Sequence, residues 1–199
     1  NGTTSPYSYF GIGELKFKGT AENRSMGGLN IFSDNIHLNI QNPASVANLI
    51  LVNFTSGGSY KYVNQETETA SQYASATTLD YLAMGIPMGK FGAIFGILPY
   101  TAVGYKLESI TDSTDTQYTG TGGMNKVFFA LAYQVTPKFN IGIDANYNFG
   151  NTQNSAVQFV YDVDGNIVQF ATGEDNRSDL SGLNFNIGSA YKGKLNDKL

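Results

Sequence analysis

Alternation of apolar and polar side chains is the feature of this chain that most limits its fold. It is clearest from Phe139 to Gly150, where every second residue is apolar and the residues between are Asn, Asp and Gly. Because successive side chains of a β-strand point to opposite faces, one face of this strand is apolar and the other is polar. The pattern recurs in Leu183–Tyr191 and Leu79–Ala83, and more loosely in Val127–Val135. The sequence therefore predicts an all-β, antiparallel fold.

The length of the alternating segments favours a transmembrane β-barrel over a soluble β-sandwich. Strands of soluble proteins usually have about 5 or 6 residues. A tilted membrane-spanning strand needs about 9 to 11 residues, which Phe139–Gly150 supplies. No stretch approaches the roughly 20 apolar residues of a membrane helix.

The connections between the predicted strands are of two kinds. Short turns are expected at Gly85–Lys90, Thr136–Lys138 and Lys192–Asp197, and longer polar stretches around Asn64–Ser71, Thr111–Thr119 and Asn151–Ser178 are expected to be loops. The short turns carry lysines, and the long stretches carry most of the Asp and Glu. We therefore expect two rims of opposite charge.

A hairpin signal leaves the strand count open. Asp164-Gly165 suits a two-residue type I′ turn, which would place Tyr161 opposite Val168. If this hairpin is a ribbon that projects from the wall, there are six strands, and if it is two further wall strands, there are eight. Since the smallest known barrels have about eight strands, the six-strand count predicts a piece of a larger barrel. The polar start at Asn1 is expected for a chain already processed for export.

Composition narrows the function. Charged residues make up 14% of the chain, which has no cysteine, one histidine and a net charge of −4. Disulfides and Cys-ligated zinc are excluded, and nucleic-acid binding is disfavoured because it needs clustered Lys and Arg. His37 has no second ligand nearby in the sequence, and no Gly-x-Ser-x-Gly motif is present. We therefore predict no enzymatic activity, no cofactor and no metal.

Residues 1–47 do not continue the strand pattern. They are rich in Gly, Asn and Ser, and Asn42-Pro43 provides the N-cap and first residue of a short helix expected to reach Leu49. We expect 1–47 to form a hatch, or plug, inside or beneath the barrel, and 48–199 to form the wall strands of an incomplete barrel.

Three short motifs in the first 50 residues carry a family resemblance. They are Arg24-Ser25-Met26-Gly27-Gly28-Leu29, Ser33-Asp34-Asn35, and the run from Gln41 to Leu49 that contains Asn42-Pro43-Ala44. Together they resemble the opening of FadL-like outer-membrane transport proteins, especially those of Bacteroidetes. The positions that match the family are Arg24, Met26, Gly27, Gly28, Asp34, Asn42, Pro43 and Ala44.

The resemblance implies a location, a function and partners. It implies a bacterial outer-membrane protein surrounded by lipid, in which a hatch plugs a barrel of about fourteen strands that binds or passes hydrophobic small molecules. This chain would be its amino-terminal half. The resemblance also leaves an alternative, because related barrels are non-transporting, structural or plugging subunits of larger outer-membrane complexes such as a type IX secretion translocon. Protein partners are then expected.

Three residues are candidates for the lumen of the barrel. Asp80 and Asp144 fall on polar faces, where a carboxylate could bind a cation, attach the hatch through a Lys or Arg, or simply line a solvated lumen. In the same pattern Leu79, Tyr81 and Ala83 share the opposite, apolar face. Phe128 is expected to point inward, where it could contact a hydrophobic ligand.

Overall fold

The computed structural model describes residues 2–31, 34–66, 71–111, 113–162, 164 and 166–193. The amino-terminal segment contains the 3₁₀ helix η1 (Pro6–Tyr9), the short strand β1 (Glu14–Leu15), the helix α1 (Ala21–Ser25) and the 3₁₀ helix η2 (Pro43–Asn48). The long strands are β2 (Asn53–Glu66), β3 (Ser71–Met88), β4 (Phe91–Ile110), β5 (Thr114–Thr136), β6 (Phe139–Tyr161) and β7 (Ile167–Tyr191). None of the described helices is long and apolar enough to cross a membrane.

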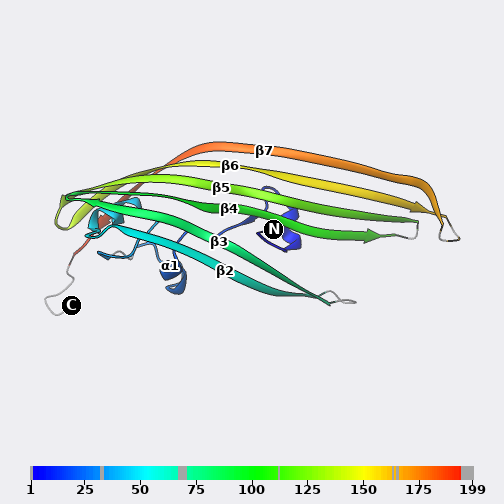
Figure 1. Ribbon diagram of the computed structural model, residues 1–199, viewed down its shortest axis with the longest axis horizontal. Helices are drawn as coiled ribbons and strands as arrows, with labels where there is room; N and C mark the ends of the chain where they lie inside the picture. Colours follow the sequence, from blue (N-terminus) through cyan, green and yellow to red (C-terminus); the bar gives the residue numbers. More distant parts are fainter. Residues whose placement is uncertain are drawn as a thin grey trace.

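The long strands form one antiparallel sheet in which spatial order follows chain order from β2 to β7. They grow from 14 residues in β2 to 25 in β7. The sheet curls into a half-barrel, and the amino-terminal segment lies beneath it (Figure 1). The prediction of an all-β, antiparallel fold is confirmed. Within the described residues, β2 and β7 each pair on one side only.

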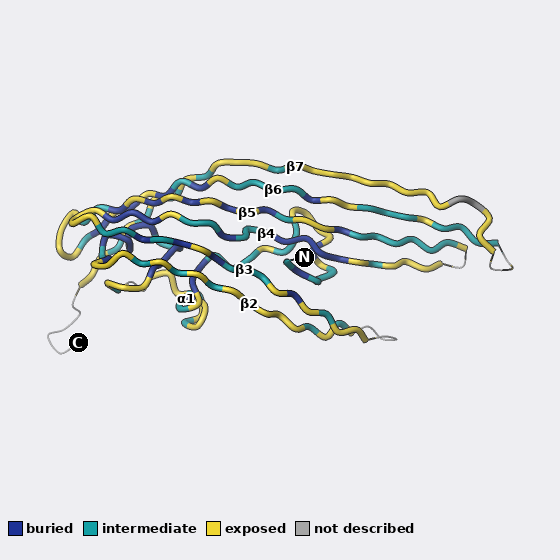
Figure 2. Tube along the Cα trace, viewed as in Figure 1, coloured by how far each residue is buried: buried dark blue, intermediate teal, exposed yellow. Residues whose placement is uncertain are grey.

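The two faces of the sheet differ as the alternation predicts. On β5, Val127 and Phe129 are exposed on the convex face, whereas Phe128 and Ala130 are buried on the concave face. On β6, Ile143 is exposed and Asp144 is buried. Buried residues concentrate where the amino-terminal segment underlies the sheet (Figure 2).

The core joins the amino-terminal segment to the concave face. Its cluster of buried side chains combines residues of the segment with residues of β3, β4 and β5: Leu38, Ile40, Val46, Ala47, Leu49, Tyr81, Ala83, Ile94, Leu98, Phe128, Ala130 and Ala132. Burying one such large side chain contributes about 1.5–3 kcal/mol, so this packing is a main source of stability.

Glycines bring η2 into contact with the sheet backbone. A Cβ at Gly142 would lie 2.6 Å from the Ala44 nitrogen, and one at Gly92 would lie 2.3 Å from the Val46 oxygen. A Cβ at Gly188 would likewise meet Asn42 at 2.4 Å. These residues of β4, β6 and β7 are glycine because the chain approaches them too closely for any side chain.

One stretch of β3 departs from the predicted pattern. Leu79 is exposed as expected, but Tyr81 and Ala83 are buried on the concave face, so the prediction that all three share one face is wrong. The cause is a register shift opposite Gly57 and Gly58, which pair with Tyr81 and Leu79 and leave Asp80 as the extra residue. Such a bulge reverses the face of every later side chain.

The polar stretches around Thr111–Thr119 and Asn151–Ser178 are mostly strand, so their prediction as loops is wrong. β5 begins at Thr114, and β6 and β7 pair as far as Tyr161 and Ile167. Apolar alternation has ended here because both faces of the sheet are largely polar, but the backbone pairing between the strands continues. The described residues hold six long strands, β2 to β7, which agrees with the six-strand count. Tyr161 pairs with Ile167 rather than Val168, since register shifts occur near the turn, in which residues 163 and 165 lie outside the described residues.

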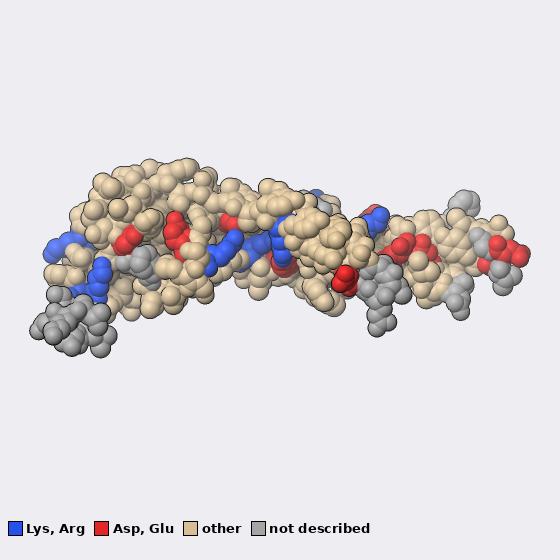
Figure 3. All heavy atoms as spheres, turned by 90° about the horizontal axis from the view of Figure 1, so that it is seen from below, with Lys and Arg blue, Asp and Glu red and all other residues tan. Residues whose placement is uncertain are grey.

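The two ends of the sheet carry opposite charge among the described residues. Lys90, Lys138 and Lys192 lie at the short-turn end, and Asp115, Asp164 and Glu174 lie toward the other. Seen from below, blue side chains occupy the end near the C-terminus and red ones the opposite end (Figure 3). Glu68, Asp112, Lys194, Lys198 and most of the predicted turn at Lys192–Asp197 lie outside the described residues.

We predict that Gly142→Val lowers the free energy of unfolding by about 1–3 kcal/mol, because the added side chain overlaps the backbone of η2. Urea denaturation in detergent, followed by circular dichroism, measures the change. Gly182→Val on β7 is the matched control, since nothing lies within 4 Å of a Cβ there. Equal losses in the two variants would contradict the close approach of η2.

Candidate functional site

The sheet is split between two neighbouring strands. β3 and β4 pair only from Leu82–Ile97 to Met88–Phe91, although both strands continue beyond Leu82 and Ile97. We call the gap between residues 71–81 of β3 and 98–110 of β4 the notch. In Figure 1 the two strands diverge along the notch, toward the end of the sheet opposite the short turns.

The amino-terminal segment occupies part of the notch. In β1, Glu14 and Leu15 pair with Ala102 and Thr101 of β4, and the Lys16 N–H donates to the Tyr100 carbonyl at 2.9 Å. β1 thus takes the position beside β4 that β3 has left.

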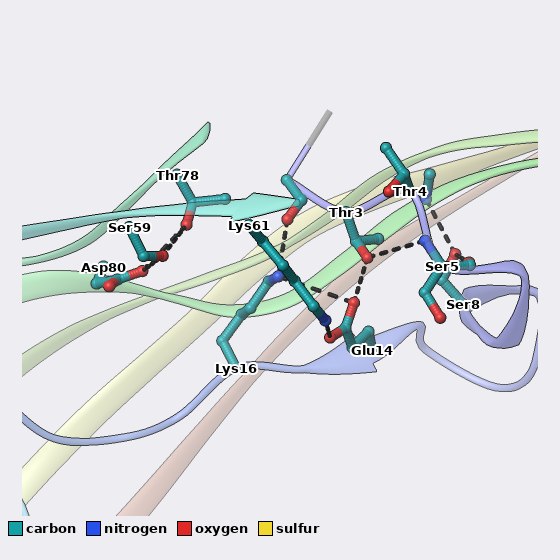
Figure 4. A network of polar contacts seen from close by, with 12 residues as sticks. Thr3, Thr4, Ser5, Ser8, Glu14, Lys16, Ser59, Lys61, Thr78 and Asp80 are labelled. Atoms are coloured by element: carbon teal, nitrogen blue, oxygen red, sulfur yellow. Dashed lines mark hydrogen bonds and ion pairs between the residues drawn. The ribbon is translucent and has the colours of Figure 1, made fainter. Parts of the chain in front are cut away.

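Glu14 connects β1 to the other side of the notch. Its carboxylate accepts hydrogen bonds from Thr3 Oγ1 and, at 3.0 Å, from Lys61 Nζ of β2. Lys16 Nζ lies 3.9 Å from the same carboxylate and donates to the Gly2 carbonyl at 2.7 Å. Figure 4 shows this network, in which a strand paired with β4 is tied to β2. We call Thr3, Glu14, Lys16 and Lys61 the clasp.

The other three residues of the clasp lower the pKa of Glu14. Burial favours the neutral form, but hydrogen bonds from Thr3 and Lys61 and the charge of Lys16 outweigh it, so the pKa of Glu14 lies below its ordinary value. A carboxylate with a lowered folded-state pKa stabilises the folded protein above its ordinary pKa of about 4.5, and this contribution is lost as the pH falls through the folded-state value.

Further hydrogen bonds attach the segment along its length. Gln65 Nε2 of β2 donates to the Thr4 carbonyl at 2.6 Å, and the Gly104 N–H of β4 donates to Ser8 Oγ at 3.1 Å. Near the bulge, the Ala21 N–H donates to the Tyr81 hydroxyl at 3.1 Å. The segment therefore makes specific polar contacts with β2, β3 and β4.

Asp80 contacts the segment through an arginine. Arg24 Nη1 donates to Asp80 Oδ2 at 3.2 Å. The other carboxylate oxygen accepts from Ser59 at 2.9 Å and Thr78 at 3.0 Å. Asp80 faces inward with Thr78, as the alternation before the bulge places it, and there it meets Arg24 in the last turn of α1.

Asp144 lies deeper in the concave face and is 4% exposed. It accepts hydrogen bonds from Asn146 and, at 2.6 Å, from Asn186, while Lys18 Nζ of the segment lies 4.0 Å away. Both predicted lumen carboxylates thus have a cation of the amino-terminal segment beside them. Within the described residues, no three His, Cys, Asp or Glu side chains come together in a way that could hold a metal ion.

Phe128 is 5% exposed and belongs to the core cluster, together with Val46 and Leu49 of the segment. The structure thus places it against protein side chains of the core.

The Met-Gly-Gly run has a local structural role. Met26 is the C-cap of α1, and Gly27 and Gly28 have φ of 72° and 86°. The Gly28 N–H donates to the Asn23 carbonyl at 2.7 Å, which ends the helix in a left-handed turn that favours glycine.

The Asn-Pro-Ala run also has a local role. Asn42 caps η2 by accepting from the Ala44 N–H at 3.0 Å, and Pro43 is its first residue. Asn42 Nδ2 also donates to the Ser189 carbonyl at 3.3 Å, and Ala44 is fully buried. The predicted helix start is confirmed, although the helix is 3₁₀.

Asp34 shapes a turn. Its carboxylate accepts from the Ile36 and His37 N–H groups, and His37 Nδ1 lies 2.5 Å from Oδ2. Burial favours neutral Asp34, but these hydrogen bonds outweigh it and lower its pKa. The hydrogen bond and attraction to Asp34 raise the pKa of His37. The pair is exposed and stabilises the turn locally.

Sequence reasoning missed Glu14, Lys18 and Lys61. One signal was available for Lys61, because it interrupts a strand in a chain with few charges. Glu14 and Lys18 lie where the sequence has no period, so nothing in it indicated which strand they would face.

We predict that Glu14→Gln lowers the free energy of unfolding by about 1 kcal/mol at pH 7, because it removes the charge from two hydrogen bonds. The difference from the unsubstituted protein shrinks as the pH falls below the ordinary value of about 4.5 and through the lowered folded-state pKa of Glu14, where Glu14 itself becomes protonated. Urea denaturation at pH 3 to 7 measures this. Glu66→Gln on β2 is the control, because the hydrogen bond that Glu66 accepts from Asn64 is long, at 3.5 Å, and exposed. A pH-independent difference would argue against the clasp.

Comparison with known proteins identifies the family. The model of the BamG family matches residues 1–199, the whole of the sequence. No curated protein and no solved structure gives a significant match. The assignment to the FadL-like transport proteins is therefore wrong. The motifs that suggested it are short: the first ends α1, the one at Asn42-Pro43-Ala44 begins η2, and Asp34 of the remaining one shapes a turn. The chain belongs to the BamG family, which points to an outer-membrane-associated protein of a BAM-related complex.

Proposed function

We propose that this chain is a non-transporting, non-enzymatic structural subunit of an outer-membrane complex. Its sheet would be wall of a membrane β-barrel, and residues 1–47 would be a fixed plug. The observation that carries the proposal is that one segment packs against the concave face through a shared apolar core and ion pairs to Asp80 and Asp144.

The convex face supports insertion into lipid. Its exposed side chains between the short turns and the middle of the sheet are large and apolar, and they include Phe95, Phe129, Leu131, Ile141, Ile143, Phe185 and Ile187. On β6 this belt runs from Phe139 to Phe149, which matches the about 9 to 11 residues of a tilted membrane strand. We call it the apolar belt. In water, so large an apolar surface would favour aggregation.

Aromatic side chains lie at both ends of the apolar belt. Phe91 and Tyr133 contact each other at a centroid distance of 4.7 Å next to the short turns. Tyr147 stacks on Phe149 at 5.7 Å at the other end. Aromatic girdles at the two membrane interfaces are typical of outer-membrane barrels.

The plug is attached by contacts that are costly to break. Moving it away would expose Leu38 and Val46 and would leave buried Asp144 without the charge of Lys18. Removing one partner of a buried charge costs several kcal/mol, which favours a plug that stays in place over one that cycles.

Affinity purification of the tagged protein from its native outer membrane, in a mild detergent, tests the proposal. We expect one or more outer-membrane proteins at fixed stoichiometry, kept through gel filtration, and no lipid-sized ligand in the concave face by native mass spectrometry. A solitary chain carrying a tightly bound small molecule would contradict the proposal.

We predict that Leu131→Arg prevents stable insertion, because an arginine on the lipid face near the bilayer centre costs about 2–4 kcal/mol. Folding into lipid vesicles, followed by gel mobility without heating, measures insertion. Ser178→Arg, at an exposed position of β7 beyond the apolar belt, is the matched control and is expected to insert normally. Normal insertion of Leu131→Arg would show that the convex face does not contact lipid.

A further inference from the structure

The two sides of the notch carry backbone edges that no strand covers along most of their length. Within the described residues, 71–81 of β3 pair with β2 alone, and residues of β4 beyond Ala102 pair with β5 alone. Every N–H and C=O on these edges needs a hydrogen-bond partner. An exposed edge is a template for the addition of a strand.

The chain already demonstrates strand addition in the notch. β1 adds to β4 at Thr101 and Ala102, and the contact extends through Lys16 to Tyr100. Next along the edge, the Gly104 N–H is bonded by a side chain, the Ser8 hydroxyl, and not by a strand. The edge of β4 therefore accepts extended backbone, and its own chain covers only a short part of it.

Two cavities in the notch lie along these edges. One, of about 660 Å³, is lined by Thr77, Thr78 and Leu79 of β3 and by Pro99 and Ala102 of β4, among others. The other, of about 600 Å³, lies between Gln72 and Ala74 on one side and Lys106 and Leu107 on the other. Gly2 and Lys16 border the first cavity, and Thr3 and Thr4 border the second. The notch thus has unfilled volume on both sides of the segment.

The unpaired edges favour polypeptide over hydrocarbon. The lining of the two cavities is mixed: small and uncharged polar residues lie beside the apolar Leu79, Ile97, Leu98 and Phe149 of the first cavity, and the charged groups are few and of both signs, Lys16, Lys106 and Glu108. A hydrocarbon ligand would leave the backbone edges unpaired, at the cost of burying polar groups without partners. An extended peptide pairs with them directly.

The notch also lies where such a peptide has access. It begins at Leu82 and Ile97, and Ile97 is level with Val127 and Tyr147 at the end of the apolar belt away from the short turns. From there it extends into the polar half of the sheet, which water surrounds in the proposed orientation. An open edge is tolerated in water, whereas in lipid it is not.

We propose that the notch between β3 and β4 is an acceptor site for an extended strand of a partner protein in the outer-membrane complex. The clasp keeps the notch open at a fixed width, because it attaches β1 to β4 and Lys61 to Glu14 and so prevents β3 and β4 from closing on each other. This inference rests on the proposed function, since it assumes a complex.

Amide hydrogen exchange, measured by mass spectrometry on the purified complex and on the isolated protein, tests strand addition. We expect peptides covering 71–81 and 103–110 to exchange at least about tenfold more slowly in the complex, since strand addition protects the edge amides of both strands. Peptides from the paired segment Val127–Val135 are the control and should not change. An intact complex in which neither notch peptide changes would overturn the notch proposal and leave the proposed function standing.

Photo-crosslinking identifies the occupant. A benzoylphenylalanine at Thr77 on β3 and one at Leu107 on β4 should label the same short stretch of a single partner, while one at Phe129 on the convex face should not label it. Labelling of unrelated partner stretches from the two sides, or of a small molecule or lipid alone, would overturn the proposal. Failure of any partner to co-purify would overturn both the notch proposal and the proposed function.

Discussion

The close approach of η2 to the sheet backbone is the contact on which the rest of the structure depends. Gly92, Gly142 and Gly188 lie on three different strands, and together they leave room for Asn42, Pro43 and Val46 against the concave face. This contact fixes where the segment enters the half-barrel, and the core around Val46 and Phe128 forms behind it. In the same half-barrel, Lys18 and Arg24, which precede η2 in the chain, pair with Asp144 and Asp80.

The same path explains the split in the sheet. Where the segment reaches β4, it pairs as a strand and takes the edge that β3 would otherwise use. The polar contacts of Glu14 and Thr4 with β2 substitute for part of the missing ladder. A continuous ladder between β3 and β4 would have closed the wall. The segment binds to β4 instead, and the wall stays open there. In the polar half of the sheet the unpaired edges cost little free energy, because water forms hydrogen bonds with the remaining backbone groups.

Much of the wall could be predicted from the sequence, because period-two alternation depends only on strand geometry and on the contrast between the two faces. Val127–Val135 and Phe139–Gly150 have the faces expected of them. The prediction failed at Tyr81, where a bulge next to Gly57 and Gly58 reverses the faces, and in the polar stretches around Thr111–Thr119 and Asn151–Ser178, where alternation carries no signal. The inward position of Asp80 and Asp144 followed from parity, but their partners Arg24 and Lys18 come from a segment without period. The motifs did not identify the family correctly, because they mainly begin or end short helices, a local role that unrelated proteins share.

A spin-label distance between the segment and the wall tests the fixed plug most directly. The chain has no cysteine, so labels can be placed at exposed Leu29 of the segment and at exposed Lys138 of the turn between β5 and β6. Double electron–electron resonance on the membrane-embedded complex should give one narrow distance distribution. A broad distribution, or two populations, would show that the segment moves relative to the wall and would contradict the account.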